Sequence, residues 1–359
     1  MLTPVQKTLE FLSLYQVMQE NYPFFQVKKR QSGVDWLANQ QQYIQQIANT
    51  PDDQEYYFKL KSILAQLQDS HLAIVSPHYI TGLKDMYQNI GYQAWSRKLA
   101  AALPDYQYWM KLIPKPAAND SAAETSGFIA KEYNQHGAVY LQIPRFKLSS
   151  KAGEDLKKYL LDHGSASKVI IDIRGNQGGN AAQILYLIPP LISAPLTAEF
   201  TFVLKGGGLI NDYIPSVHIP SKDILQPLAT LPDGLEYPPE LFTEFKSYFN
   251  VAYQIEPCPN SFRGQVYLLV DQEVYSSAET LTAWCKSTGF ATIVGERTRG
   301  DGIGFDPVFY QLPHSRLLLS LPLALGLNSN GQANAEWGTN PDIICNPQAA
   351  LEMILQDRQ

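Results

Sequence analysis

The sequence predicts an α/β protein that begins with a helical region. Two observations indicate the α/β part: apolar, β-forming segments alternate with helix-like segments over residues 137–188, and a second unit of this kind spans residues 265–295. A third observation concerns the first part of the chain. From Thr3 to about Leu67, apolar side chains recur at steps of three and four residues, which is the period of an amphipathic helix.

The length and composition indicate a folded protein with two domains, or with one large domain and an accessory part. The chain has 359 residues, of which 45% are hydrophobic and 17% are charged, and this composition is too apolar for a disordered chain. We expect an N-terminal helical bundle (residues 1–75), a connecting or cap segment (76–134) and a main α/β domain (135–359). We find no internal repeat.

The charge and the cysteines exclude several classes of protein. A net charge of -6 without a Lys/Arg cluster gives no electrostatic footprint for nucleic acid or for an anionic membrane surface. No apolar run reaches the length of a membrane span, and "LLLSLPLALGL" (317–327) contains serine, proline and glycine, so it predicts strand and turn. The three cysteines are too far apart to predict a disulfide framework or a zinc site. The N-terminus lacks the continuous apolar segment of a secretory signal, so we expect a cytoplasmic protein, with export after removal of a leader as an open alternative.

The helical period is clearest in "DDQEYYFKLKSILAQLQDSHL", where Asp52 and Asp53 mark a helix start and the pattern ends near Asp69. The segments "KTLEFLSLYQVMQENYPFF" and "VDWLANQQQYIQQIAN" have a similar pattern. The polar segment 114–127 predicts a loop or flap.

The α/β part is predicted as follows. Strands are expected at 137–144, 168–173, 265–271 and 291–295, and helices at 150–163, 181–188 and after Ser276. Between the two units, the glycine- and proline-rich residues 205–240 predict a long surface excursion.

Two adjacent serines stand at the junction of a strand and a helix in "VDQEVYSSAETLTAW" (270–284). Ser276 with Glu279 fits a capping box, in which the two side chains satisfy free amides of the first helical turn. The alternative is a nucleophile, which needs a base, an oxyanion site and a third group that orients the base. The motif alone does not decide between them.

A glycine-rich turn follows the expected strand at 168–173, in "DIRGNQGGN" (172–180). It is compatible with a plain strand-to-helix turn. The GK[ST] ending of a phosphate-binding loop is missing, and the glycine spacing does not match GxGxxG. Outward-facing amides that hold an oxyanion are the remaining functional interpretation.

Four motifs, "VIIDIRGNQGGN", "DQEVYSSAETL", "GFATIVGERTRGDGIG" and "EWGTNPDI", occur in this order over residues 169–344. Together they resemble the catalytic domain of the tail-specific, or C-terminal processing, serine peptidases. The resemblance implies a crotonase-like (ClpP/crotonase) spiral fold for residues 135–359. It also implies that Ser276 is the nucleophile, with Glu279 as the acidic residue of its S-x-x-[ED] motif, and that the amide of Ser277 contributes to the oxyanion hole.

The chain departs from the better known branch of this family at its general base. That branch has a lysine where "GERTRGDG" has Asp301, so the Ser-Lys dyad is lost, and Lys286 has no obvious route back to Ser276. A second branch, which includes tricorn protease and the domains of interphotoreceptor retinoid-binding protein, resembles this chain in "LQDSHLAI", where a histidine serves as base. This resemblance implies that His71 is the general base. Without it, His71 would be interpreted as a histidine that caps the C-terminus of a helix.

The same branch implies two further residues and completes the expected site. Glu336 in "EWGTNPDI" would orient His71, either directly or through Ser70. The amide of Gly178 or of Gly179 would join that of Ser277 in the oxyanion hole. A full PDZ domain does not fit between the expected bundle and residue 137.

The resulting hypothesis is a serine peptidase that acts on peptides or unstructured protein segments through an acyl-enzyme, with no metal and no cofactor. With a reference pKa of about 6.5 for histidine, its activity should fall in mild acid. The first alternative is an inactive relative that binds a peptide or an apolar ligand in the cleft. A second is an acyl-CoA enzyme of the same fold, although the chain has no basic cluster for the CoA phosphates. The oligomeric state and the substrate stay open.

Overall fold

The computed structural model describes residues 1–116, 127–211, 213, 225–259 and 262–357. Most of the loop expected at 114–127 and part of the excursion expected at 205–240 therefore lie outside the described residues. The helices are α1 (Pro4–Asn21), α2 (Phe25–Ser32), α3 (Gln40–Ala48), α4 (Asp53–Ala65), α5 (Ile80–Asn89), α6 (Gln93–Leu112), α7 (Ser150–Asp162), α9 (Leu241–Glu244), α10 (Ser277–Thr288), α11 (Asn334–Trp337) and α12 (Pro347–Gln356). The strands are β1 (Ala73–Ile74), β2 (Ile129–Tyr133), β3 (Ala138–Gln142), β4 (Lys168–Asp172), β5 (Leu196–Leu204), β6 (Gln226–Pro227), β7 (Ser247–Ile255), β8 (Gln265–Val270), β9 (Thr292–Gly295), β10 (Val308–Gln311), β11 (Leu318–Leu321), β12 (Ala324–Leu327) and β13 (Ile343–Ile344).

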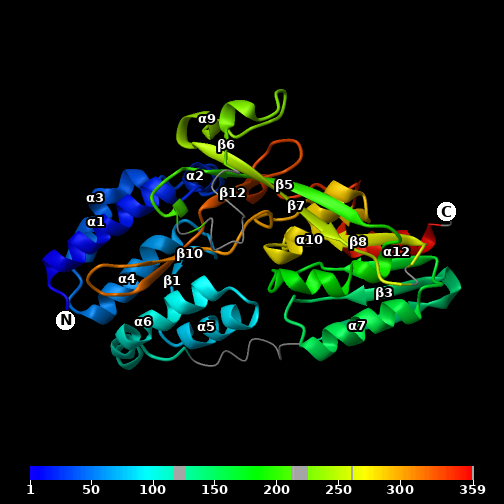
Figure 1. Ribbon diagram of the computed structural model, residues 1–359, viewed down its shortest axis with the longest axis horizontal. Coiled ribbons are helices and arrows are strands. Elements are labelled where there is room, and N and C mark those ends of the chain that lie inside the picture. The colour runs from blue at the N-terminus through cyan, green and yellow to red at the C-terminus, as the bar shows by residue number, and fades with distance from the viewer. Residues whose placement is uncertain (117–126, 212, 214–224, 260–261, 358–359) are drawn as a thin grey trace.

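A six-stranded sheet forms the centre of the α/β part. Its strand order is β13-β9-β8-β4-β3-β2, and all neighbours are parallel except β2, which is antiparallel to β3. Side chains alternate between the two faces of a strand. Tyr140, Ile170 and Leu269 pack with Ile354 of α12 on one face, while the residues between them join the main core on the other. Figure 1 shows this sheet with α7 and α12 at one end of the molecule. The α/β prediction is confirmed.

Two smaller sheets adjoin the first. The long strands β5 and β7 pair antiparallel over their full length, with β12 and β6 at the edges, and β1, β11 and β10 form the third sheet. The expected strand and turn at 317–327 are present as β11 and β12. The sequence did not predict β5 or β7. The helix expected at 181–188 is a 3-10 helix, Ala181–Tyr186.

The N-terminal region is helical, as expected. Asp52 caps α4 by accepting a hydrogen bond from the Glu55 amide at 2.8 Å, and α1 to α4 lie at the opposite end of the molecule from the large sheet (Figure 1). Their interface is aromatic, with Phe11, Trp36 and Tyr43 fully buried against one another. Two helices that the sequence did not predict, α5 and α6, follow this region.

The large sheet brings two loops together at one edge. Strands β4 and β8 are parallel neighbours, with Asp172 opposite Leu269 at their carboxyl ends. The glycine-rich turn 173–180 leaves β4 at this edge, and the segment that carries Ser276 leaves β8 beside it. Carboxyl ends of parallel strands are where ligand sites form in α/β sheets, and the site described next lies there.

Among the described residues, no helix has both the length and the apolar character needed to cross a membrane.

Candidate active site

Ser276 occupies the turn between β8 and α10 and does not cap the helix. Its backbone has φ 55° and ψ -127°, and its side chain makes no capping hydrogen bond. A non-glycine residue in this region costs on the order of 1–3 kcal/mol and persists only where the surroundings hold it. The Gly300 carbonyl, which accepts from the Ser276 amide at 3.3 Å, is one such restraint. The capping-box interpretation is therefore wrong, and the hydroxyl is available for another partner.

That partner is His71. Its Nε2 lies 3.2 Å from Ser276 Oγ although 205 positions separate the two residues. His71 lies in a turn six residues beyond the end of α4, so it does not cap that helix. The turn is anchored on both sides: the His71 amide donates to Asp69 Oδ1 at 2.8 Å, and its carbonyl accepts from Ser320 Oγ at 2.9 Å. The structure thus brings together the two residues that the resemblance assigned as nucleophile and base.

The acid beside His71 is Asp301, and this differs from the expectation. Asp301 Oδ2 lies 3.0 Å from His71 Nδ1. Glu336 instead accepts two hydrogen bonds from Arg30 of α2, at 2.7 and 2.6 Å, and Arg30 also binds Glu240. Because Glu336 is engaged by a guanidinium of the N-terminal region, it does not orient the imidazole in this structure. Asp301, which the sequence comparison placed at the position of the lost lysine, thus lies on the other side of the imidazole from Ser276.

Ser70 reaches this group through a tyrosine. Its hydroxyl donates to Tyr275 Oη at 3.2 Å, and Tyr275 Oη donates to Asp301 Oδ2 at 2.5 Å. The Tyr275 ring also stacks on the His71 ring, with centroids 5.6 Å apart and planes inclined by 14°. We expected Ser70 to connect Glu336 to His71, but in this structure it contacts Tyr275 instead. Sequence reasoning missed Tyr275, although it directly precedes Ser276.

Charges around the imidazole favour its protonated form. Burial lowers the pKa of His71, but the carboxylates of Asp301, Asp69 and Asp306 outweigh this and raise it to about 9. Burial likewise acts to raise the pKa of Asp301, but His71 prevails and lowers it below its usual value. Asp301 is thus held as a carboxylate that stabilises an imidazolium.

The three groups Asp69, His71 and Asp301 have ligand atoms within 4.8 Å of one another, close enough in principle for a cation. However, His71 Nδ1 is already used by its hydrogen bond to Asp301. We assign no metal to this group.

Two backbone amides beside Ser276 lack protein acceptors among the described residues, those of Gly179 and Ser277. Both residues line the cavity that contains Ser276. The Gly178 amide, by contrast, donates to Asn176 Oδ1 at 2.8 Å. Of the two glycines considered for an oxyanion hole, Gly179 is thus the one whose N–H is free. Glycine is needed at position 179 for two reasons. The backbone has φ 145°, and an added Cβ would lie only 2.1 Å from the Phe146 carbonyl oxygen.

Asn176 shapes this turn and was not foreseen. It is fully buried, its side chain donates to the Ile143 carbonyl at 2.9 Å and accepts from Gly178, and its carbonyl accepts from the Tyr275 amide at 3.2 Å. The Asn176 carbonyl therefore fixes the glycine turn against the residue before Ser276.

The site opens into a cavity of about 390 Å³ that reaches from His71 and Ser276 to Phe24 of the N-terminal region. His71, Ser276 and Asp301 lie on one part of its wall, and Phe24, Met86 and Ile90 on another. The N-terminal region and the helix pair α5 and α6 therefore help to shape the cleft.

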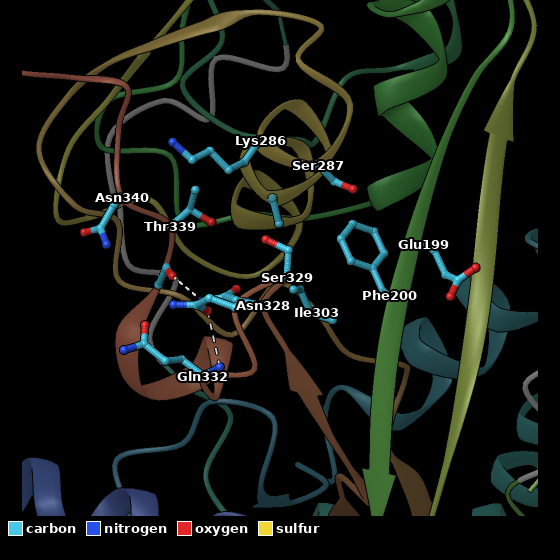
Figure 2. Close-up of a pocket in the computed structure, with 13 residues that line it drawn as sticks. Glu199, Phe200, Lys286, Ser287, Ile303, Asn328, Ser329, Gln332, Thr339 and Asn340 are labelled. Carbon is cyan, nitrogen blue, oxygen red and sulfur yellow. Dashed lines mark hydrogen bonds between the residues drawn. The ribbon is translucent and has the colours of Figure 1, made fainter. Parts of the chain in front are cut away.

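A second cavity, of about 360 Å³, adjoins the first and is mainly apolar. Five residues line both cavities: Ala181, Ala182, Thr280, Gly302 and Gly304. Further along α10 lies a separate polar cavity of about 190 Å³ (Figure 2). Phe200 and Ile303 line both this and the apolar cavity. Lys286 also lines the polar cavity, where it is paired with Asp342, and it does not line the cavity that contains Ser276.

A sequence profile of peptidase family S41 matches residues 137–345, more than half of the chain. The chain belongs to peptidase family S41. It is accordingly a serine-type peptidase, a hydrolase of the class that includes C-terminal processing proteases. The profile match contains Ser276, Asp301 and the glycine-rich turn, whereas His71 precedes it.

Solved structures that resemble this family S41 peptidase have low sequence identity and show the fold. A protein from Parabacteroides merdae ATCC 43184 is 16% identical, with 100% of this chain and 98% of the other covered and a TM-score of 0.60. Mature CPAF is 13% identical, with 98% and 96% covered and a TM-score of 0.59. The photosystem II D1 C-terminal processing protease is 14% identical, with 99% and 97% covered and a TM-score of 0.51. No curated protein matched the sequence.

Proposed function

We propose that this family S41 peptidase cleaves peptides or unstructured protein segments through an acyl-enzyme at Ser276, with His71 as general base and Asp301 as the carboxylate that orients it. One observation carries the proposal: the hydrogen bonds from Ser276 Oγ to His71 Nε2 and from His71 Nδ1 to Asp301 form a continuous chain, at 3.2 and 3.0 Å. This is the geometry by which a serine hydroxyl is activated.

In the first half of the reaction, His71 Nε2 takes the proton of Ser276 as Oγ forms a bond to the scissile carbonyl carbon. The carbonyl oxygen becomes an anion, which the amides of Gly179 and Ser277 stabilise. Asp301 stabilises the imidazolium. His71 then gives its proton to the leaving nitrogen, the carbon–nitrogen bond breaks, and the acyl group remains on Ser276.

In the second half, a water molecule replaces the departed amine. His71 takes a proton from this water as its oxygen attacks the acyl carbon, and the resulting tetrahedral anion is held by the same two amides. The bond to Ser276 Oγ breaks, and His71 returns a proton to the serine. No redox agent or metal is needed to balance these steps.

The test of this proposal is hydrolysis of an unstructured, internally quenched fluorescent peptide or of casein. The wild-type chain should release fluorescence and produce fragments with new N-termini. A protein that only binds would retain the intact peptide on size-exclusion chromatography and release none, and this result would overturn the proposal. The complete hydrogen-bonded site argues against such a binding role.

The pH dependence of kcat/KM should have an acidic limb well above pH 6.5. His71 must be neutral to accept a proton, and its pKa is raised to about 9, so activity should increase as the pH rises through the alkaline range. The sequence alone led us to expect a fall in activity only in mild acid. The pKa of His71 is higher than that expectation assumed mainly because Asp301 lies beside the imidazole. The measurement is kcat/KM for one peptide between pH 5 and pH 10; a limb near 6.5 or below would contradict the assigned environment of His71.

The apolar cavity suggests the residue preferred before the scissile bond. If the substrate carbonyl oxygen points to Gly179 and Ser277, the leaving nitrogen must lie toward His71, and the acyl side chain must lie away from it. The apolar cavity fits that side, since it is lined by Ala181 and Ala182, which follow Gly179, and not by His71.

We therefore expect peptides with a large apolar residue before the scissile bond to be cleaved faster than otherwise identical peptides with glycine or aspartate there. Ala182→Phe, at an exposed position on the cavity wall, should reduce this preference by filling the space, whereas Ala182→Ser should keep it. The measurement is kcat/KM for the matched peptides. Equal rates for all three peptides with the wild-type enzyme would refute this preference.

We further propose that residues 135–359 form the catalytic domain with a crotonase-like spiral fold. Residues 1–75 and 76–134 would then be a bundle and a cap that cover its cleft. The mixed α/β sheet and the cavity walls contributed by Phe24 and Met86 support this division.

A further inference from the structure

The turn that carries Asp301 has an unusual backbone. Gly300 has φ 93° and Asp301 has φ 60°, so both lie in the left-handed region, which aspartate adopts more readily than most side chains but still only occasionally. Such a conformation needs support from outside the turn. One support is the hydrogen bond from the Ser276 amide to the Gly300 carbonyl.

The other support is Asn334, at the start of α11. Its Oδ1 accepts from the Gly302 amide at 2.8 Å and from the Ile303 amide at 3.3 Å, directly after Asp301. Its Nδ2 donates to Glu279 Oε1 at 2.7 Å and to Asn328 Oδ1 at 3.0 Å. Asn334 is fully buried. Because both donors and both acceptor directions of the amide are used, its orientation is fixed.

Glu279 ties this asparagine to the helix of the nucleophile. It lies three residues after Ser276, is fully buried, and accepts a further hydrogen bond from Thr339 Oγ1 at 2.6 Å. The Gly302 backbone also packs against it, since an added Cβ there would lie 2.6 Å from Glu279 Cβ. Burial raises the pKa of Glu279 to about 7, against the hydrogen bonds from Thr298, Thr339 and Asn334, which lower it.

We infer that Asn334, oriented by Glu279, is a positioning residue that keeps the Asp301 carboxylate on His71 during catalysis. The inference rests on the proposed function of Ser276, His71 and Asp301. Without Asn334, the Gly302 amide would be buried without an acceptor, and the turn would relax to satisfy it. A displacement of about 1 Å at a catalytic group is enough to lower a rate about 10²-fold.

This role has a signature in the pH profile. The charged groups facing His71 are Asp301, Asp69 and, further away, Asp306; Lys28 faces Asp301, and Arg299 lies over the Tyr275 ring. If Asp301 leaves His71, the imidazole loses its main ionic partner. The acidic limb of kcat/KM should then move down from about 9 toward the ordinary histidine value.

The experiment uses Asn334→Asp, Glu279→Gln and the double variant in the full chain. Asn334→Asp keeps the oxygen that accepts from the Gly302 amide, but a second oxygen replaces the nitrogen that donates to Glu279 and Asn328. The side chain is then repelled from its anchor on Glu279 and should pull the Asp301 turn with it, so we expect plateau kcat/KM to fall about 10²-fold and the acidic limb to move down. In the double variant, the side-chain amide introduced by Glu279→Gln can donate to the new carboxylate. This exchange of donor and acceptor should restore at least part of the activity and move the limb back, which a general loss of stability would not do.

Thr339→Val is the matched control, since it removes a hydrogen bond that the same Glu279 oxygen accepts. It leaves in place both hydrogen bonds that Asn334 accepts from the amides of Gly302 and Ile303, so its limb should not move. If Asn334→Asp fails to fold, Asn328→Ala removes one of the two hydrogen bonds that Asn334 Nδ2 donates, together with the bond from Asn328 to the Gly338 carbonyl, and should cause a smaller shift in the same direction. If the wild-type enzyme is active but the acidic limb of kcat/KM does not move in the variants that stay soluble, this inference alone is overturned. If the wild-type chain is inactive and does not react with a fluorophosphonate, the proposed function is overturned instead.

Discussion

Replacing Ser276 with alanine should lower kcat by about 10⁶-fold, the loss seen when the nucleophile of a serine protease is removed. The variant lacks the oxygen that forms the acyl-enzyme, and the remaining oxyanion amides supply only a small residual rate. Fold and stability should be preserved, because the hydroxyl does not cap α10. The measurement is kcat for the quenched peptide, with circular dichroism to confirm folding.

Ser287→Ala is the matched control for this variant. Ser287 is exposed on the same helix, at the polar cavity rather than at the cleft, so its loss should leave kcat within about twofold of wild type, as for surface substitutions generally. Retention of activity in Ser276→Ala would show that the nucleophile lies elsewhere.

Asp301→Asn should lower kcat by about 10⁴-fold, the loss expected when the acid of a serine triad becomes an amide. The amide can donate to His71 Nδ1 and so favours the wrong tautomer, and it no longer stabilises the imidazolium. Glu336→Gln should cost far less activity, because Glu336 binds Arg30 and not the imidazole. The measurement is kcat for both variants with the same peptide.

This pair of variants separates two assignments of the acid. The sequence resemblance pointed to Glu336, and the structure points to Asp301. A large loss in Glu336→Gln together with a small one in Asp301→Asn would return the role to Glu336 and would require the Arg30 ion pair to open in the active enzyme.

The α/β class, the N-terminal helices and the junction at Ser276 could be predicted because each leaves a local pattern. Apolar periodicity marks the strands of the large sheet, and Asp52 marks the start of α4. Strands β5 and β7 carry mixed polar and apolar residues on partly exposed faces, so their long-range pairing has no comparable local signal. Helix α6 does carry a helical period, since Trp95, Leu99, Ala102, Tyr106 and Trp109 are buried at steps of three and four residues, but Pro104 inside it is a residue that normally breaks a helix.

The proposed nucleophile and base, Ser276 and His71, were assigned through motif resemblance, since no local pattern joins residues 205 positions apart. The ion pair that holds Glu336 away from His71 in this structure could not be foreseen, because its partner Arg30 is 306 positions away. Asp301 was considered only as a residue unable to replace a lysine base. The signal that would have identified Asp301 is its place in the motif. The resemblance puts a general base at this position, close to the nucleophile, and a carboxylate there is suited to orient a histidine base.

The most direct test of the proposed mechanism is mass spectrometry of the intact chain, followed by peptide mapping, after reaction with a small fluorophosphonate. We expect a single adduct on Ser276, formed more slowly when His71 is replaced by alanine and absent when Ser276 is replaced by alanine. An unmodified wild-type chain, or an adduct on another residue, would contradict the claim that Ser276 is the activated nucleophile.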